Sequence, residues 1–308
     1  MQIVRPPAVA GAFYPADPGQ LRASVDTLLD GASQARTSRT PDASIDPRAA
    51  EVVREVTARA LHGPPKAIVV PHAGYMYSGP VAASAYASLA RADAPRDGRS
   101  RITRVVLVGP CHRVPVEGIA VPDADALDTP LGRVPVDAAA MELLSRFPEV
   151  TRSGRAHARE HSLEVQLPFL QRVLGAFEVV PLAVGSAPAA TVARVLDALW
   201  GGPETLIVVS SDLSHYLPYA IGKGVDRYTA QRVLELSPVL DPSEACGATP
   251  LNALLIVARQ RRLIPTLLDL RSSGDTAGPR EGVVGYGAFG FFEEEAQRKG
   301  GEHHGRSA

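Results

Sequence analysis

The sequence lacks several features that would place a protein in a familiar class. Its formal net charge is only −1 over 308 residues, which gives no electrostatic case for binding nucleic acid or a membrane surface. No apolar run approaches the roughly 18 residues that a membrane span requires. The first residues, MQIVRPPAVAG, lack the basic and apolar regions of a secretory signal. Two cysteines, Cys111 and Cys246, are too few for a disulfide framework, so we expect a reduced, cytoplasmic protein.

Common catalytic motifs are also missing. The chain has no phosphate-binding P-loop and no GxSxG nucleophile elbow. GYGAFG at residues 285–290 matches GxGxxG, but it lies inside a strand-like run near the end of the chain, with no room for a βαβ unit. We therefore expect no dinucleotide site. The run SSDLSH at residues 210–215 contains the letters of a catalytic triad, yet near neighbours in sequence rarely reach that geometry.

Buried apolar runs alternate with helix-like stretches along the chain. With 45 % hydrophobic and 21 % charged residues, the composition supports an ordinary core. The pattern predicts an α/β layered sandwich with a largely parallel central sheet, in one domain over residues 1–292. We expect residues 33–46 to form a polar surface insertion and residues 293–308 a disordered tail. The predicted strands are 67–70, 104–108, 118–121, 177–184, 205–209, 263–270 and 283–292, and the predicted helices 79–91, 137–147, 162–174, 189–200, 222–236 and 250–262.

Three of the predicted strands are each followed closely by a histidine. His72 follows residues 67–70, His112 follows residues 104–108 and His215 follows residues 205–209. Ligands of open α/β sheets bind beyond the carboxyl ends of the strands, so these histidines are expected at one edge. A histidine there often only bonds the backbone, but three together favour a shared site, and imidazole is a common metal ligand.

Two further segments carry residues that could serve such a site. In REHSLEVQ, at residues 159–166, Glu160 or Glu164 could hydrogen-bond a metal-bound imidazole, or the acidic residues could simply stabilise a helix N-terminus. His161 and Glu164 are predicted to share a helical face. Cys246, in CGATP before an apolar helix, could be a small buried side chain or could complete a metal site with two histidines.

Seven stretches taken together resemble the Memo family, whose prokaryotic members are called AmmeMemoRadiSam system protein B. They run in the family's order from Val4 to Phe289, nearly the whole chain. The matching stretches are VRPPAVAGAFYP, PHAGYMYSGPVAASAY, LVGPCHR, EHSLEVQLPFLQ, SSDLSHY, ACGATPL and GYGAF. The resemblance implies a fold similar to that of the class III extradiol dioxygenases, which are non-haem iron enzymes.

The resemblance also implies roles for particular residues. The metal ligands would be His72, His112 and Cys246, with cysteine in the place of the dioxygenases' carboxylate. His215 would act as the acid or base, with Asp212 beside it. The remaining family positions would line the substrate pocket: His161, Glu164, Tyr75 and Tyr77. Cys111 departs from the Asn, Ser or Thr that usually precedes the second histidine in the family, and it could compete as a thiolate or merely pack.

Different functions are compatible with these features. One is a redox enzyme, with iron as the expected metal and copper or zinc as alternatives, acting on an unknown small-molecule or peptide ligand. Another is a non-catalytic interaction protein with a vestigial pocket. The family name further implies radical-SAM and AMMECR-type partner proteins. The chain itself lacks the three-cysteine cluster motif of a radical-SAM protein.

Overall fold

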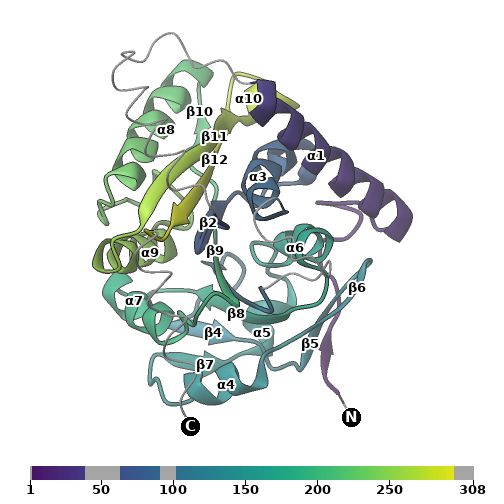
Figure 1. The fold of residues 1–308 in the computed structure, drawn as a ribbon, viewed down its shortest axis with the longest axis vertical. Coiled ribbons are helices and arrows are strands. Elements are labelled where there is room, and N and C mark those ends of the chain that lie inside the picture. The colour runs from purple at the N-terminus through teal and green to yellow at the C-terminus, as the bar shows by residue number, and fades with distance from the viewer. Residues whose placement is uncertain (1, 39–62, 91–101, 295–308) are drawn as a thin grey trace.

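A mixed nine-stranded sheet forms the centre of the fold. A computed structural model describes residues 2–38, 63–90 and 102–294 (Figure 1). The strands of the sheet are β2 (Ala67–Val70), β3 (Arg104–Pro110), β4 (Ile119–Val121), β7 (Val150–Arg152), β8 (Glu178–Val184), β9 (Thr205–Ser210), β10 (His215–Leu217), β11 (Ile264–Ser272) and β12 (Val283–Phe292). Their order is β10-β12-β2-β9-β3-β8-β4-β7, and β11 pairs with β12 beside this path.

The expectation of a largely parallel sheet holds for its four central strands. β2, β9, β3 and β8 pair in parallel, and their apolar runs are buried on both faces. The outer pairings of β12 with β2, β10 and β11, and of β4 with β8, are antiparallel, so there the expectation was wrong. Only residues 273–282 connect β11 to β12, which is shorter than the dozen or so residues that a parallel crossover needs.

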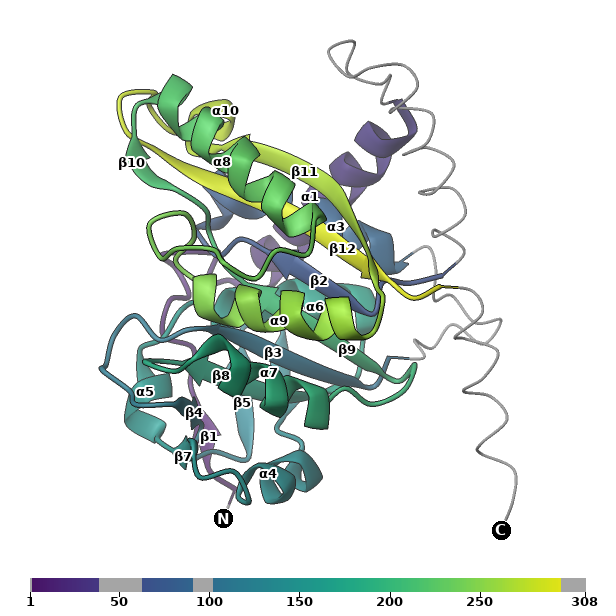
Figure 2. The ribbon, with the colours of Figure 1, turned by 90° about the vertical axis from the view of Figure 1, so that its left-hand side faces the viewer.

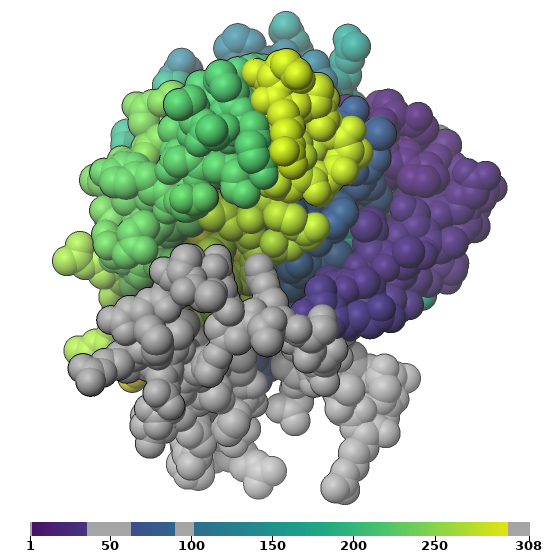
Figure 3. All heavy atoms as spheres, turned by 90° about the horizontal axis from the view of Figure 1, so that it is seen from above, coloured from purple at the N-terminus to yellow at the C-terminus, as the bar shows by residue number. Residues whose placement is uncertain are grey.

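Helices cover both faces of the sheet, as the layered prediction required. The longer helices are α1 (Pro18–Ser38), α3 (Tyr75–Ala90), α6 (Leu167–Leu174), α7 (Ala189–Ala198), α8 (Tyr219–Leu234) and α9 (Ala248–Gln260). α1, α3 and α6 pack together on one face, while α7 packs on α9 and α8 packs on β11 and β12 (Figure 2). Seen from above, α1 and α8 lie on opposite sides of the C-terminal strands (Figure 3). Among the described residues, every helix is too short or too polar to cross a membrane.

The smaller elements complete the layers. They are the helices α4 (Ala138–Leu144), α5 (Gly154–Ala158) and α10 (Ser273–Thr276), the 3₁₀ helix η1 (Glu164–Gln166), and a separate sheet of β1 (Val4–Arg5), β5 (Ala126–Thr129) and β6 (Gly132–Pro135). The helix expected over residues 162–174 is divided into η1 and α6. Pro168 lies at the first turn of α6, where its fixed φ suits a helix start.

Helix α1 corrects one prediction. Residues 33–38 belong to this helix rather than to a surface insertion, while residues 39–46 and 295–308 lie outside the described residues. The sequence carried a start signal, since Asp17 accepts a hydrogen bond from the Gln20 amide at 2.8 Å just before Pro18. Leu21 and Val25 then bury one face. The later turns of α1 are polar, so the sequence did not show that the helix continues through residues 33–38.

A buried ion pair fastens the N-terminal segment to the rest of the fold. Arg5 Nη1 lies 2.5 Å from Glu164 Oε2, and the side chains are 8 % and 0 % exposed. The remaining lone pairs of Glu164 accept hydrogen bonds from the amides of Ala8 and Val9 and from the Tyr14 hydroxyl. The Arg5 guanidinium also donates to the carbonyl oxygens of residues 157 and 160. Since both charges are fully hydrogen-bonded, the pair holds the segment against the loop before η1.

We expect Arg5→Ala to lower the free energy of unfolding by about 3–5 kcal/mol, because Glu164 keeps a buried charge without its counter-ion. Urea denaturation followed by circular dichroism measures the change. The matched control is Arg133→Ala, which breaks the exposed pair between Arg133 and Asp128 and is expected to change the free energy of unfolding far less, because solvent screens that pair. Equal effects of the two substitutions would contradict the fastening role.

Candidate metal centre

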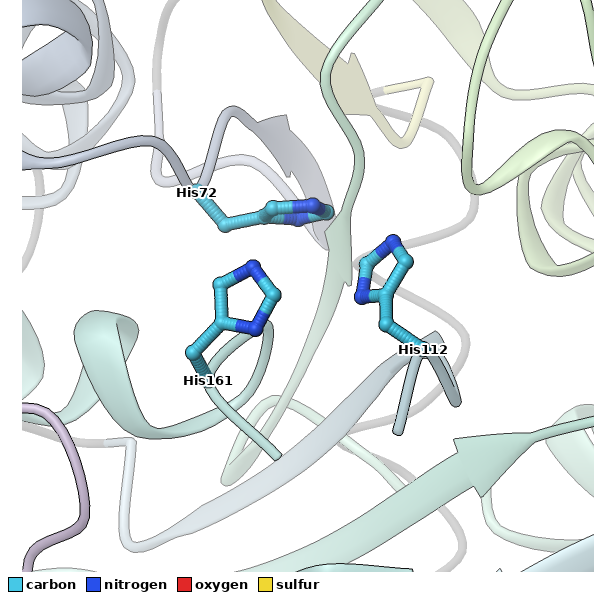
Figure 4. A group of neighbouring side chains, drawn as sticks. All are labelled: His72, His112 and His161. Carbon is cyan, nitrogen blue, oxygen red and sulfur yellow. The ribbon is translucent and has the colours of Figure 1, made fainter. Parts of the chain in front are cut away.

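Three histidines from separate segments meet at one edge of the sheet. His72 follows β2, His112 follows β3, and His161 lies between α5 and η1. One ligand atom from each lies within 4.8 Å of the others, and the ring centroids are 4.9–5.5 Å apart. Figure 4 shows the three rings gathered around a common space. The strands β2 and β3 both run parallel to β9, so their carboxyl ends deliver two of the histidines to the same edge.

His72 is the most deeply buried of the three. The residue is 2 % exposed, and burial, assisted by the nearby His112, lowers its pKa to about 3, so the imidazole is neutral at neutral pH. Nδ1 lies 3.0 Å from Ser210 Oγ, and Nε2 lies 3.3 Å from Cys246 Sγ. The backbone amide donates to Asp212 Oδ1 at 2.7 Å, which fixes the turn after β2.

His112 is oriented by the buried carboxylate of Glu160. The His112 amide donates to Oε2 at 2.6 Å, and the ring Nδ1 lies 3.2 Å from Oε1. Because a carboxylate only accepts, we assign the ring proton to Nδ1, and the lone pair of Nε2 is then free for a ligand. The sequence left two roles open for the acidic residues of this segment, hydrogen bonding to an imidazole of the site or stabilising a helix N-terminus. Glu160 takes the first role.

Glu160 is ionised in spite of its burial. Burial alone would raise its pKa, but hydrogen bonds from the His112 ring and from the amides of Ser162 and His112 outweigh that effect and lower the pKa to about 2. The His161 amide also donates to Oε1, at 2.9 Å. A single carboxylate thus joins the segments that carry His112 and His161.

His161 carries a buried nitrogen atom that makes no hydrogen bond. Burial, with His72 next in effect, lowers the pKa of His161 to about 4. Its Nδ1 has no hydrogen-bond partner, although Glu160 Oε1 lies 3.3 Å away, outside good geometry. The ring packs on Phe13 with a centroid separation of 4.9 Å. His161 therefore has an incomplete set of hydrogen bonds beside two other imidazoles, which is unusual for a buried polar atom and marks the ring as part of a site.

Cys246 reaches this group through His72. Its thiol is largely buried, and burial together with Asp212 raises its pKa to about 12. Among the described residues, it is not one of the group whose ligand atoms all lie within 4.8 Å. The turn at Gly247 allows the approach, because a Cβ there would lie 2.7 Å from that of Ser211. Without a metal the thiol is protonated and faces His72 Nε2.

His215 lies near the three histidines but outside their group. The chain continues from β9 through residues 211–214 before His215 enters β10 and pairs with β12. The third histidine of the cluster is therefore His161 rather than the His215 of the strand-end pattern. The His215 Nδ1 lies 2.8 Å from the carbonyl oxygen of Leu213, which leaves Nε2 as its free base. A charge on His215 would act on His72 and on Asp212, whose own pKa is raised chiefly by burial.

The expected pocket residues have different surroundings. Glu164 is occupied by the N-terminal segment, and the Tyr75 hydroxyl donates to the carbonyl oxygen of Val165 at 2.7 Å while its ring packs on Phe169. The polar atoms of Glu164 and Tyr75 thus face the N-terminal segment and η1, and the expectation that both residues line the pocket stays a prediction. Tyr77 is half-buried in the first turn of α3, and its role stays a prediction.

Sequence reasoning did not single out Ser210 and Gln166. Ser210 touches His72, and Gln166 donates to Ser210 Oγ and to the Pro71 carbonyl oxygen, each at 2.9 Å. Both lie inside stretches already noted, SSDLSHY and EHSLEVQ, which is the signal that could have drawn attention to them. The other cysteine, Cys111, has its thiol 3.2 Å from the carbonyl oxygen of Val114, and burial raises its pKa.

Comparison with known proteins decides the family. A family model described as Memo-like protein matches residues 5–289. The chain belongs to this family. Relatives named MEMO1 family protein include one from Ignicoccus hospitalis, 36 % identical, and one from Pyrobaculum arsenaticum, 33 % identical, each aligned over 94 % of this chain and 99 % of the relative. An uncharacterized protein of Escherichia coli K12 gives a TM-score of 0.45 at 19 % identity, over 72 % of this chain and 98 % of that one.

Glu160→Gln is expected to remove an acid-dependent part of the stability of this Memo-like protein. A carboxylate with a folded pKa of about 2, against 4.5 in its ordinary state, stabilises the fold above pH 4.5 and loses that contribution as the pH falls toward 2. The wild-type advantage should be on the order of 3 kcal/mol near neutral pH and shrink below pH 4.5. Denaturation of both proteins with a chelator present, from pH 7 to 3, measures it. A difference that is constant across this range would contradict the assignment.

Proposed function

We propose that this Memo-like protein holds a redox-active metal ion at His72, His112 and Cys246, and uses it in oxidoreductase chemistry of the dioxygenase type on an unknown substrate. The 3.3 Å separation of His72 Nε2 and Cys246 Sγ carries the proposal. Two donors on one ion, with a metal–nitrogen bond of about 2.1 Å and a metal–sulfur bond of about 2.3 Å, lie roughly 3.1–3.6 Å apart at ordinary angles. The thiol and the imidazole therefore already have the spacing of neighbouring ligands.

The protonation of the residues also fits a metal site. Burial keeps His72 and His161 neutral, and only neutral imidazole can donate a lone pair to a metal. The Nδ1 atoms of His72 and His112 both face oxygen atoms, which leaves each Nε2 as the ligand atom. Carboxylate and hydroxyl partners of this kind orient metal-binding imidazoles in many proteins.

The donor set favours particular metals. A thiolate beside imidazoles suits iron, copper and zinc far better than the hard cations calcium and magnesium. We place iron first and keep copper and zinc as alternatives. An iron or copper ion would supply one-electron redox chemistry and a position for a substrate.

Residues at and near the proposed metal ligands would release, accept or donate protons. The Cys246 thiol has its pKa raised to about 12, so it would release its proton when it becomes a ligand, and metal binding should strengthen as the pH rises. His215 has a free Nε2 and would serve as the acid or base. Asp212 accepts the His72 amide, so we propose that it also positions the loop that carries His72.

His161 and Cys246 are the two candidates for the third ligand. His161 belongs to the group of three histidines and carries the unpaired Nδ1, whereas Cys246 has the ligand-like distance to His72. We propose Cys246 as the ligand and His161 as a residue of the substrate pocket. Substitution of each residue by alanine separates the two possibilities.

Elemental analysis of tag-free protein purified without oxygen should find close to one iron or copper ion per chain. His72→Ala and Cys246→Ala should each lose most of it, because each removes a proposed ligand. Cys111→Ala is the matched control and should keep the metal, since Cys111 is the other free cysteine and is engaged with Val114. A wild-type protein without metal, beside folded variants that do not differ from it, would defeat the metal-site proposal and favour an interaction protein.

His215→Gln should retain the metal, because His215 lies outside the group of ligand atoms. It should instead alter how the consumption of dioxygen by the loaded protein, in the presence of ascorbate, depends on pH. An oxygen electrode and elemental analysis on the same preparation give both results. Loss of the metal as complete as in His72→Ala would make His215 a ligand and contradict its role as acid or base.

A further inference from the structure

We propose that Ser210 and Gln166 are positioning residues that hold His72 in one tautomer, with its proton on Nδ1 and its lone pair on Nε2, facing Cys246. This inference rests on the proposed function for its purpose, since a lone pair on Nε2 is what a metal ligand needs. The tautomer itself is a property of the metal-free chain. It follows from counting the protons available in a closed set of buried hydrogen bonds.

The count begins at the hydroxyl of Ser210, which has a single proton to donate. Three polar groups surround Ser210 Oγ: the carbonyl oxygen of Ser162 at 2.6 Å, Nε2 of Gln166 at 2.9 Å and Nδ1 of His72 at 3.0 Å. A carbonyl oxygen can only accept, so the Ser210 proton goes to Ser162. The other two contacts of Oγ must then be acceptances.

The side chain of Gln166 is oriented by a further contact. The Tyr86 hydroxyl lies 2.9 Å from Gln166 Oε1, and Gln166 Nε2 lies 2.9 Å from both the Pro71 carbonyl oxygen and Ser210 Oγ. The amide nitrogen therefore faces two acceptors, and a flipped side chain would put an oxygen against a carbonyl oxygen. Gln166 thus donates to Ser210.

The remaining contact of Ser210 decides the tautomer of His72. Ser210 Oγ has no proton left, so His72 Nδ1 has to be the donor. The opposite tautomer would set the lone pair of Nδ1 against the lone pairs of Oγ, and it would also point an N–H group at Cys246 Sγ. A neutral imidazole carries one ring proton, which leaves Nε2 unprotonated and open to the thiol or to a metal.

Burial makes this arrangement strict. Ser210, Gln166 and His72 are between 0 % and 2 % exposed. Water cannot readily replace a missing partner at that depth, so each buried polar atom depends on its neighbours. The same hydrogen bonds also tie the ends of β2 and β9 to the segment that carries Glu160 and His161.

The first measurement needs no variant. Long-range proton–nitrogen NMR spectra of metal-free protein labelled with ¹⁵N in its histidines report which ring nitrogen is protonated, and His72→Ala identifies the His72 signals. We expect His72 to show a single tautomer, protonated at Nδ1. A ring protonated at Nε2, or a mixture of both forms in the wild-type protein, would overturn the proposal.

Ser210→Ala then tests which residue holds the tautomer. The substitution removes the hydroxyl and leaves Cβ in place, so His72 should lose its single form and show protonation at Nε2. Ser162→Ala is the matched control, because it removes another fully buried hydroxyl, which donates to the Pro110 carbonyl oxygen and not to His72. The control should keep the wild-type tautomer. An unchanged tautomer in folded Ser210→Ala would overturn the role of Ser210.

Titration with cobalt(II), followed by its visible absorption, separates this inference from the proposed function. The dissociation constant should rise roughly 10- to 100-fold in Ser210→Ala, the range usual for residues that orient a metal ligand, and by much less in Ser162→Ala. If the wild-type protein binds no cobalt(II), iron or copper while His72 still shows the predicted tautomer, the tautomer assignment stands and the metal-site proposal fails.

Discussion

The shared register of three parallel strands is the constraint on which the site depends. Val69 of β2 and Val108 of β3 both pair with Val209 of β9, so the three strands are abreast near their carboxyl ends. His72 and Asp212 each follow three residues after this row, and His112 follows four residues after it. A slip of register in β9 would change every one of these relations, and the continuous burial of the three strands disfavours such a slip.

Three imidazoles that range from buried His72 to exposed His112 lie close together, and the surrounding residues determine whether they carry protons. Burial lowers the pKa values of His72 and His161, and repulsion between protonated rings would lower them further. Glu160 supplies the negative charge nearby and accepts backbone amides from both histidine-bearing loops. His72 and His161 are therefore neutral, and the Glu160 carboxylate and the Ser210 hydroxyl orient His112 and His72, an arrangement that suits a bound cation.

Much of this arrangement could be predicted from sequence, for reasons that differ by residue. His72 and His112 were predictable because strand runs such as residues 67–70 are unambiguous and parallel neighbours share an edge. The strand-end pattern grouped His215 with these two histidines, whereas the structure groups His161 with them. This difference could not be predicted, because it depends on the path of residues 211–214 and of the loop before η1. The contacts of Glu164 were also hidden, since its partner Arg5 is 159 residues away in the chain. The local pattern of CGATP left Cys246 either as a small buried side chain or as a ligand, and the family resemblance favoured the ligand.

X-ray absorption at the metal edge tests the central claim most directly, because it reports the atoms bound to the ion. Cys111→Ala protein loaded with iron or copper is the best sample, since Cys246 is then its single thiol. Ligation by Cys246 and the histidines predicts one sulfur near about 2.3 Å together with a nitrogen shell near about 2.1 Å that carries the outer scattering of imidazole rings. A spectrum with only nitrogen and oxygen neighbours would contradict the role of Cys246 and leave the three histidines as the alternative site.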